Sequence, residues 1–238
     1  MLSPEELFDL SGFAHREIFS GCKFAWQALS KLENYIKEQF AKGYAPSINI
    51  AVPPGVFIEG EVYIGPGTVI EPGTLIYGPT IIGENCEIRQ GAYIRGNVIL
   101  GNKAIVGHAS EVKNTIFLDN AHAPHFAYVG DSILGNQVNL GAGTRLANMP
   151  MFSAKDPVTL KRPTIRIRVD GKEIDTGLSK LGAILGDEVQ TGCNTVTNPG
   201  CIVGPRTLIY ALTSLRSGYY PADSIIKLRQ QTEKVVRK

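Results

Sequence analysis

An aliphatic residue recurs at every sixth position in the first half of the chain, and this spacing constrains the fold more than any other feature. The twelve positions are Val52, Ile58, Ile64, Ile70, Ile76, Ile82, Ile88, Ile94, Leu100, Val106, Val112 and Leu118. Gly, Pro, Asn and other small or polar residues lie between them, as in IGPGTV and LGNKAI. A period of six fits neither an α-helix nor an isolated strand. It is the hexapeptide repeat of a parallel β-helix.

The repeat predicts a triangular prism with an interior column of aliphatic side chains. Three hexapeptides close one coil, so residues eighteen apart stack at a spacing of about 4.8 Å. Arg95 and Lys113 each follow an inward residue and are eighteen apart, which predicts that they stack on adjacent coils and point outward. Two such cations repel each other unless an anion lies between them. A phosphate suits both residue types, although a pair of solvated surface cations is the alternative.

We divide the chain into three regions. Residues 1–46 read as helical, with a Ser-Pro-Glu-Glu start, and we expect them to pack on the base of the prism. Residues 47–220 form the β-helix, and residues 221–238 are expected to form a short C-terminal helix. Two inward positions near the C-terminal end are Thr191 and Thr197, so the interior column is expected to be weaker there.

The repeat breaks twice. Leu118 and Leu134 are sixteen residues apart, which we interpret as four surplus residues in a loop at 119–133 that is extruded from the prism and carries His125. The second break, at 149–181, contains an alternating segment, an Asp170-Gly171 turn and a returning segment. This pattern predicts an inserted β-hairpin with a type I′ turn. Loops on a rigid scaffold often carry function.

Composition bounds the remaining possibilities. The formal net charge is +2, which gives no reason to expect a nucleic-acid partner, and we expect none. The four cysteines show no CxxC spacing and no disulfide framework. The chain has no signal-peptide pattern and no apolar run of about 18 residues. We therefore expect a cytoplasmic protein that does not span a membrane.

A spaced set of residues resembles one enzyme family. The set comprises Glu111-Val112-Lys113, His125, Tyr128-Val129-Gly130-Asp131, Ile133-Leu134-Gly135-Asn136, Val138 to Thr144, and Asn148. It is similar to the acetyltransferase half of the bifunctional glucosamine-1-phosphate acetyltransferase and N-acetylglucosamine-1-phosphate uridyltransferase. The resemblance covers roughly residues 88–211. It implies a left-handed prism, which is an exception to the usual right-handed crossover, and a homotrimer with sites between subunits.

The resemblance also implies roles for individual residues. His125 matches the catalytic base, and Glu111 and Asn148 match polar groups that position base and substrate. The positions that match contacts to the sugar 1-phosphate are Arg95, Lys113, Tyr128, Asn139 and Lys180. The positions that match the lining of the acetyl-CoA site are Ala142, Cys193 and Ala211. The last two are eighteen residues apart and should stack. The implied reaction is acetyl transfer from acetyl-CoA to the amine of glucosamine 1-phosphate, which supplies cell-envelope sugar synthesis.

The chain departs from that family at three places. Position 193 is Cys where the family has Ser, the segment 149–181 replaces a much shorter loop, and the uridyltransferase half is absent. The string Gly141 to Leu146 echoes a nucleotidyltransferase phosphate loop, but it lies within the hexapeptide register. We therefore interpret it as part of the prism.

Three alternatives stay open. A related sugar acyltransferase could use another acceptor or acyl chain, since the segment 149–181 could reshape the acceptor pocket. A non-catalytic β-helix scaffold is the second alternative. The third is a zinc enzyme similar to the γ-class carbonic anhydrases. His108, His122 and His125 are available as ligands, but their spacing does not match that family, so we predict no metal.

Overall fold

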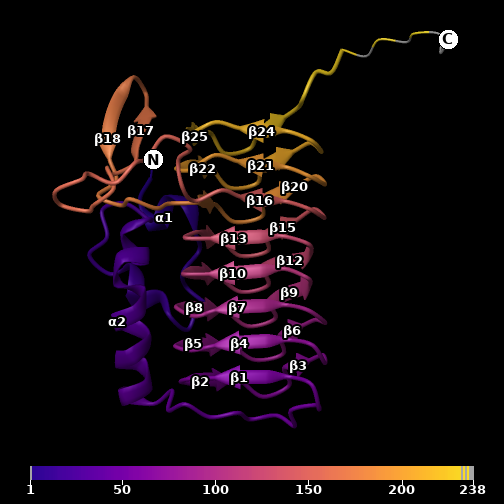
Figure 1. Ribbon diagram of the computed structural model, residues 1–238. Coiled ribbons are helices and arrows are strands. Elements are labelled where there is room, and N and C mark those ends of the chain that lie inside the picture. Colours follow the sequence, from indigo (N-terminus) through magenta and orange to yellow (C-terminus); the bar gives the residue numbers. More distant parts are fainter. Residues whose placement is uncertain (1, 232, 234, 236–238) are drawn as a thin grey trace.

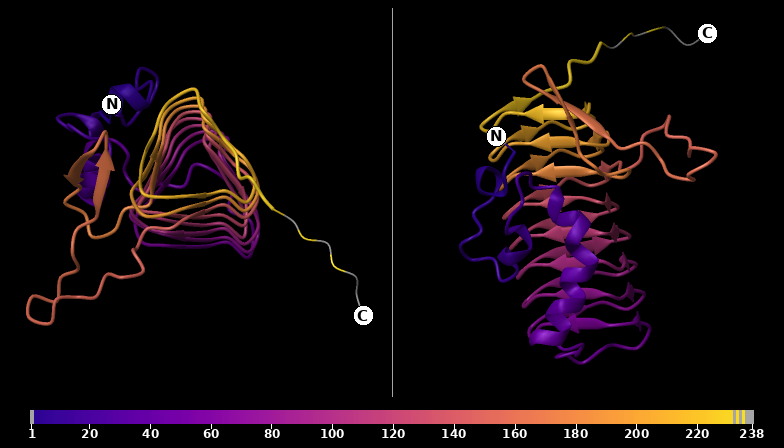
Figure 2. Two further views of the ribbon diagram at one scale, coloured as in Figure 1. Left: turned by 90° about the horizontal axis from the view of Figure 1, so that it is seen from above. Right: turned by 90° about the vertical axis from the view of Figure 1, so that its left-hand side faces the viewer.

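The computed structural model describes residues 2–231, 233 and 235. Three parallel sheets of eight strands each form the sides of a triangular prism (Figure 1). We call them the first, second and third faces, in the order in which the chain meets them. Seen from the C-terminal end, the chain turns clockwise as it rises towards the viewer, which makes the coil left-handed (Figure 2). The predicted left-handed parallel β-helix is confirmed.

The strands are short because each one spans a single side of the prism. The first face contains β1 (Phe57–Glu59), β4 (Leu75–Tyr77), β7 (Tyr93–Arg95), β10 (Glu111–Lys113), β13 (Tyr128–Gly130), β16 (Arg145–Leu146), β21 (Val196–Thr197) and β24 (Ser214–Leu215). The second face contains β2 (Val62–Ile64), β5 (Thr80–Ile82), β8 (Val98–Leu100), β11 (Thr115–Phe117), β14 (Ile133–Leu134), β19 (Ala183–Leu185), β22 (Cys201–Val203) and β25 (Gly218–Tyr220). The third face contains β3 (Val69–Ile70), β6 (Glu87–Ile88), β9 (Ile105–His108), β12 (His122–His125), β15 (Asn139–Leu140), β20 (Gln190–Thr191), β23 (Leu208–Ile209) and β26 (Ile225–Ile226).

The predicted aliphatic positions fill the interior of the prism, with two exceptions. The positions from Ile58 to Val112 belong to one apolar cluster or pack against it. Val52, at the N-terminal end of the repeat, is 39% exposed. At the other end, Phe117 and not Leu118 faces the interior, and Leu118 is buried in a separate cluster outside the prism.

The predicted extruded loop at 119–133 is wrong. These residues continue the coil as β12, β13 and the start of β14. Val112 pairs with Val129 and Val106 with Ala123, seventeen residues apart instead of eighteen. One residue is missing at the corner after β10, where Asn114 alone separates two strands with a φ of 47°. A second residue is missing at the corner after β13, where the inward residues Val129 and Leu134 are only five apart and Asp131 has a φ of 48°. Two shortened corners therefore explain the break that we interpreted as four surplus residues.

The outer side of the second face is apolar as well. The central residues of its strands point outward, and they include Tyr63, Ile81, Ile99, Ile116, Ile133, Ile184, Ile202 and Tyr219. The N-terminal arm, residues 2–44, covers this ladder. The arm holds helix α1 (Pro4–Leu7), the 3-10 helix η1 (Arg16–Phe19) and helix α2 (Gln27–Lys42). Its Trp26, Leu32 and Ile36 are fully buried in the same cluster as the ladder.

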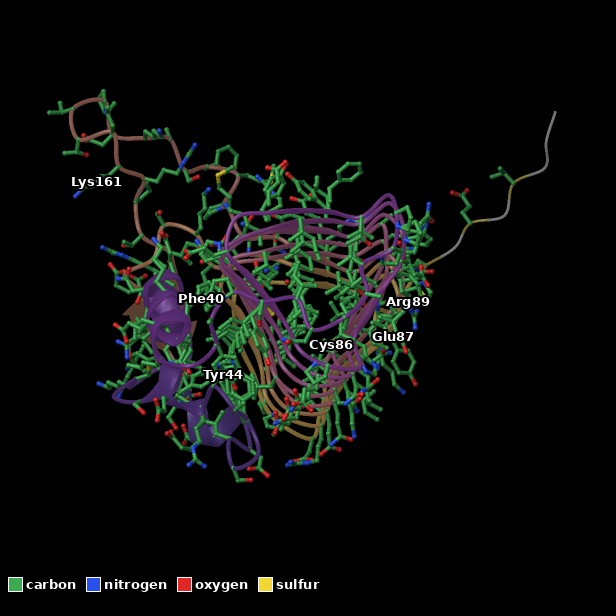
Figure 3. All side chains as sticks on the ribbon, turned by 90° about the horizontal axis from the view of Figure 1, so that it is seen from below. Phe40, Tyr44, Cys86, Glu87, Arg89 and Lys161 are labelled. Carbon is green, nitrogen blue, oxygen red and sulfur yellow. The ribbon has the colours of Figure 1, made fainter. Side chains whose placement is uncertain are left out.

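The expected helical N-terminal region is therefore present, but its predicted location on the base of the prism is wrong. Helix α2 runs along the side of the prism (Figures 1 and 2), because the apolar surface that it covers is a whole face. In the view from below, Phe40 and Tyr44 of the arm lie at one face. The ion pair of Glu87 and Arg89 lies well away from them (Figure 3), with 2.8 Å between its charged atoms.

The predicted hairpin at 149–181 is confirmed. Strands β17 (Arg166–Val169) and β18 (Lys172–Asp175) pair antiparallel. Asp170 and Gly171 both have positive φ, as a type I′ turn requires. The apolar side of the hairpin includes Ile165 and Ile167, which are buried in the cluster on the second face. The indole N–H of Trp26 donates to the carbonyl of Thr176 at 3.2 Å, so the arm and the hairpin cover this face together.

The expected C-terminal helix is not found among the described residues 221–231, 233 and 235. Ile225 and Ile226 form strand β26, which pairs with β23. Ile226 lies six residues after Tyr220, and both pack against the interior column, so the hexapeptide repeat continues where we expected a helix. Residues 232, 234 and 236–238 lie outside the described part of the chain. No helix in the described part is long and apolar enough to cross a membrane.

Candidate functional site

One column of residues stands at the corner between the third and first faces. β12 ends at His125, whose Cα partner on the coil below is His108. β15 pairs with β12 through His122 and Asn139, which places Ala142 on the coil above His125. The pairings of Leu140 with Thr191 and of Thr191 with Ile209 carry the same register to Cys193 and Ala211.

The column brings together the proposed base and the proposed acetyl-CoA positions, which the sequence pattern alone did not place side by side. The stacking of Cys193 and Ala211 is confirmed by the strand register. The sequence did not place His125 beneath Ala142, because the shortened corner at Asp131 reduces that offset to seventeen residues. The amide N–H of Gly143 donates to the carbonyl of His125 at 3.0 Å, which ties the two coils together. An imidazole at the end of this column can accept a proton from a group bound along the corner.

A second group lies on the first face, towards its corner with the second face. An Arg95 Nη1 donates to Glu111 Oε1 at 2.6 Å, and this bond raises the pKa of the guanidinium. The guanidinium also lies over the ring of Tyr93, 5.6 Å from its centroid. Val112 pairs with Ile94, so Lys113 stands directly above Arg95, as the sequence predicted.

Tyr128 and Asn148 complete this group. β13 pairs with β10 and places Tyr128 opposite Glu111. Burial raises the pKa of the Tyr128 hydroxyl, the nearby Glu111 carboxylate adds to this, and a hydrogen bond with Asn148 opposes it. The group therefore combines two cations, a carboxylate, a phenol and an amide on one half-exposed surface. Such donors can hold a phosphate and a sugar hydroxyl.

Asp131 is a structural partner that sequence reasoning did not assign. Its side chain is 6% exposed, and it accepts hydrogen bonds from the Nδ2 groups of Asn114 and Asn148. These bonds fix the side chain of Asn148 beside Tyr128. The signal in the sequence was present, because Asp131 belongs to the Tyr-Val-Gly-Asp string. It lies at the second shortened corner, one coil above Asn114.

The structure does not bring all the predicted site residues together. The column with His125 and the group with Arg95 lie at opposite edges of the first face within one chain. Glu111 begins β10, at the edge of that face nearer to His125, but its carboxylate reaches along the face to Arg95 at the other end of the neighbouring strand. Asn139 lies on the third face, between His122 and Gln190 on the adjacent strands. Lys180 is exposed and precedes Leu181, whose N–H donates to the Asn148 carbonyl at 3.0 Å.

Among the described residues, no group of three or more His, Cys, Asp or Glu side chains is arranged to hold a metal ion. His122 Nε2 lies 3.1 Å from Asn120 Oδ1, and His108 Nδ1 lies 3.0 Å from the carbonyl of Gln90. His108 and His125 stack on neighbouring strands, but His122 lies at the other end of β12. The three histidines therefore do not converge.

Comparison with known families decides where the chain belongs. A family model described as the GMPPB C-terminal domain matches residues 76–211. The chain belongs to this family. The matched residues include most of the prism, the column at the third–first corner and the group on the first face. The family match also spans the insertion at 149–181, which in this chain holds the hairpin.

This member of the GMPPB C-terminal domain family also resembles curated proteins. It is 39% identical over 93 residues to a bifunctional sugar-1-phosphate nucleotidylyltransferase/acetyltransferase of Sulfurisphaera tokodaii, which covers 39% of this chain and 21% of that protein. It is 38% identical over 94 residues to the bifunctional protein GlmU of Methanococcus maripaludis strain C7. This match covers 40% of this chain and 20% of the Methanococcus protein. The match thus spans about a fifth of the length of these relatives. Their names confirm the resemblance drawn from the sequence.

A solved structure of a Francisella novicida UDP-N-acetylglucosamine acyltransferase is also similar to the chain. The TM-score is 0.44 and the sequence identity is 15%. The superposition covers 71% of this chain and 62% of the Francisella protein.

Proposed function

We propose that this chain is a CoA-dependent N-acetyltransferase that acts on a hexosamine 1-phosphate. Glucosamine 1-phosphate is the first candidate acceptor, which would give N-acetylglucosamine 1-phosphate for cell-envelope sugar synthesis. The observation that carries the proposal is the column of His125, Ala142, Cys193 and Ala211 at one corner. It aligns the proposed base with the three positions proposed for acetyl-CoA. The names of the relatives, which include an acetyltransferase, support the same reaction.

The proposed chemistry uses His125 as a general base. The acceptor's ammonium group gives a proton to the His125 imidazole, and the free amine attacks the carbonyl carbon of the thioester. A C–N bond forms and the C–S bond breaks. The nitrogen loses a second proton as the amide forms. One of the two protons goes to the sulfur of CoA, which leaves as a thiol, and the other goes to solvent. The oxygen of the tetrahedral intermediate needs a hydrogen-bond donor. No acyl-enzyme is required, so Cys193 need not act as a nucleophile.

The proposed acceptor site is the group on the first face. Arg95 and Lys113 would hold the sugar 1-phosphate, the guanidinium by two parallel hydrogen bonds and the ammonium as a point charge. Glu111 keeps Arg95 on the surface through the bond of 2.6 Å. Tyr128, together with Asn148 held by Asp131, would contact the sugar. We assign further acceptor contacts to Asn139 and Lys180.

The proposed active unit is a homotrimer in the cytoplasm. Its support is the position of the two groups, at opposite edges of the first face of one chain. A second copy would bring its own Arg95 group to the His125 column of the first, so that each acetyl-CoA and acceptor meet between subunits. The first face is not covered by the arm or the hairpin (Figure 2), which leaves it accessible for such contacts.

The test is release of CoA thiol from acetyl-CoA in the presence of amino sugars with and without a 1-phosphate. We expect turnover with glucosamine 1-phosphate, and we expect His125→Ala to lower kcat by a factor of about 10² to 10⁴, the usual range for loss of a general base. The matched control is His108→Ala, because His108 occupies the same column one coil below. Equal losses in the two variants, or near-full turnover of His125→Ala, would remove His125 from the mechanism.

A further inference from the structure

The insertion at 149–181 builds a basic pocket, of which the proposed reaction uses only Lys180. This open pocket has a volume of about 720 Å³. Its lining residues are Met149, Lys155, Leu160, Lys161, Arg162, Thr164, Gly177, Ser179 and Lys180. Four of them are cations and none is acidic. We call it the insertion pocket. Figure 3 shows Lys161 on the part of this loop that extends away from the prism.

The charges of the insertion pocket are not neutralised by the protein. Among the described residues, no ion pair is found for Lys155, Lys161, Arg162 or Lys180. Two carboxylates of the insertion, Asp156 and Asp175, bind other groups. Asp156 accepts from the N–H groups of Val158 and Thr159, and Asp175 accepts from Thr164 Oγ1 and the Gly177 N–H.

The loop holds one of the four cations in place. An Arg162 Nη1 donates to the carbonyl and the hydroxyl oxygen of Ser153, whose side chain is buried. The loop around it is closed by hydrogen bonds between the backbones of Asp156 and Lys161, and of Leu160 and Asp156. Cations that share a pocket repel one another unless an anion lies among them. An anion is therefore the group that this pocket is suited to bind.

The size and position of the insertion pocket specify the anion further. A pocket of this volume is in the range for a ligand of drug size, so a single phosphate would fill little of it. Met149 and Leu160 add apolar surface that suits a ribose or a base. Met149 directly follows Asn148, and Lys180 precedes Leu181, which bonds to Asn148. The pocket thus adjoins the group with Arg95 and Tyr128, at the edge of the first face opposite the His125 column.

We infer that the insertion pocket binds the nucleoside diphosphate part of a substrate, in the first instance that of a nucleoside-diphosphate hexosamine acceptor. This inference rests on the proposed function and extends it. The hexosamine would lie at Tyr128 and Asn148, and Lys180, which lines the pocket, would hold the phosphate attached to the sugar. The second phosphate and the nucleoside would lie at Lys155, Lys161 and Arg162. Acetyl-CoA also contains a nucleoside diphosphate, so it is the other possible source of the same chemistry.

The first test is calorimetric binding of UDP, GDP, UMP and CoA to the full chain, which needs no acetyl transfer. We expect UDP or GDP to bind more tightly than UMP. The double variant Lys155→Ala, Lys161→Ala should weaken that binding by at least about tenfold, since it removes two cations that would hydrogen-bond to the phosphates. The control is Lys172→Ala, an exposed lysine of the same insertion that does not line the pocket. Absence of nucleotide binding, or equal binding by wild type and double variant, would overturn the inference.

The second test assigns the source of the nucleotide. With a UDP-hexosamine acceptor, the double variant should raise the acceptor KM by at least about tenfold. It should leave the KM values of acetyl-CoA and of hexosamine 1-phosphate within twofold. A rise in the KM of acetyl-CoA alone would overturn the assignment to the acceptor. Turnover of hexosamine 1-phosphate without any diphosphate binding would leave the proposed function intact and refute only this inference.

Discussion

Cys193 is the most accessible thiol of the four and stands in the column above His125. It is exposed, whereas Cys22 is half-buried and Cys86 and Cys201 are buried. Burial raises the pKa of the Cys86 thiol to about 11, and it also raises that of Cys201. Both buried thiols are therefore protonated and unreactive at neutral pH.

We predict that iodoacetamide labels Cys193 before the buried cysteines and stops acetyl transfer, because the added group lies where the acyl donor would pass. Mass spectrometry of the labelled protein and thiol-release assays measure the two effects. Acetyl-CoA should slow the labelling. The variant Cys193→Ser should keep its turnover and resist the reagent. If that variant is inactivated at the wild-type rate, Cys193 does not lie at the donor site.

Two inward threonines of the prism differ in how their hydroxyl groups are satisfied. Thr191 Oγ1 lies 2.9 Å from Thr144 Oγ1 and accepts from the Gly141 N–H at 3.0 Å. Thr197 Oγ1 is buried without a hydrogen-bond partner among the described residues. A buried hydroxyl without a partner destabilises the folded state by roughly 1–3 kcal/mol.

We therefore predict that Thr197→Val raises the free energy of unfolding by about 1–2 kcal/mol, and that Thr191→Val lowers it. Denaturant unfolding of the two variants beside the wild type measures both changes. The pair is matched because both side chains point into the same interior column, one hexapeptide apart. Stabilisation by both substitutions, or by neither, would contradict the account of their hydroxyl groups.

At the scale of elements, the N-terminal arm depends on a buried histidine. His15 is 3% exposed. Its Nδ1 lies 3.3 Å from the Tyr35 hydroxyl, and its ring contacts those of Tyr44 and Phe13. Burial lowers the pKa of His15 from 6.5 to about 4. Between these two values the unfolded chain binds the proton and the folded arm does not, so the free energy of unfolding falls as the pH falls.

We predict that lowering the pH from 7.5 to 4.5 reduces the stability of the arm by roughly 2–3 kcal/mol through His15 alone. Fluorescence of Trp26, the single tryptophan, follows the unfolding of the arm in denaturant. Other groups also titrate in this range, so the measured quantity is the difference between the wild type and His15→Gln. A pH slope that is the same in both proteins would show that the imidazole is not buried as a neutral group.

The sequence predicted the elements of the prism well where each coil has eighteen residues. From Ile58 to Val112, each inward residue is six positions from the next, and the structure agrees. The prediction failed at Ile116-Phe117-Leu118, three consecutive apolar residues of which any could face inward. Only the pairing of Phe117 with Leu100 on the coil below decides between them, and that contact is not visible in a one-dimensional pattern.

In the candidate site too, contacts that depend on the three-dimensional register could not be predicted from the sequence pattern. The stacking of Arg95 and Lys113 followed from an offset of eighteen residues, and so did that of Cys193 and Ala211. The position of His125 beneath Ala142 required the offset of seventeen, which the sequence alone did not provide. The pairing of Glu111 with Arg95 depends on side-chain directions across two strands. The insertion pocket depends on the path of a loop that no repeat constrains.

At the scale of the whole molecule, the prism has three sides with different surfaces. The outward residues of the second face are aliphatic or aromatic from Tyr63 to Tyr219, and the arm and the hairpin bury them. Those of the third face are mixed and none is fully buried: Glu87, His122, Asn139 and Gln190 are polar, whereas Val69, Ile105, Leu208 and Ile225 are apolar. An apolar face of this length would promote aggregation if it were uncovered. The arm therefore protects the molecule as well as stabilising it.

The role of the apolar second face in holding the arm can be tested by placing one charge on the second face and one on the third. Ile99 is fully buried beneath the arm, and Ile105, six residues later, points outward on the uncovered third face. We predict that Ile99→Arg releases the arm, because an unpaired charge at this contact is strongly unfavourable, and that Ile105→Arg does not. Limited proteolysis within residues 1–46 measures release of the arm. Binding of a hydrophobic dye measures exposure of the apolar ladder, and sedimentation velocity measures aggregation. The prediction requires all three to change for Ile99→Arg while the prism itself stays folded by circular dichroism. Release of the arm by Ile105→Arg, or an arm that stays protected in Ile99→Arg, would mean that the apolar ladder of the second face is not what holds it.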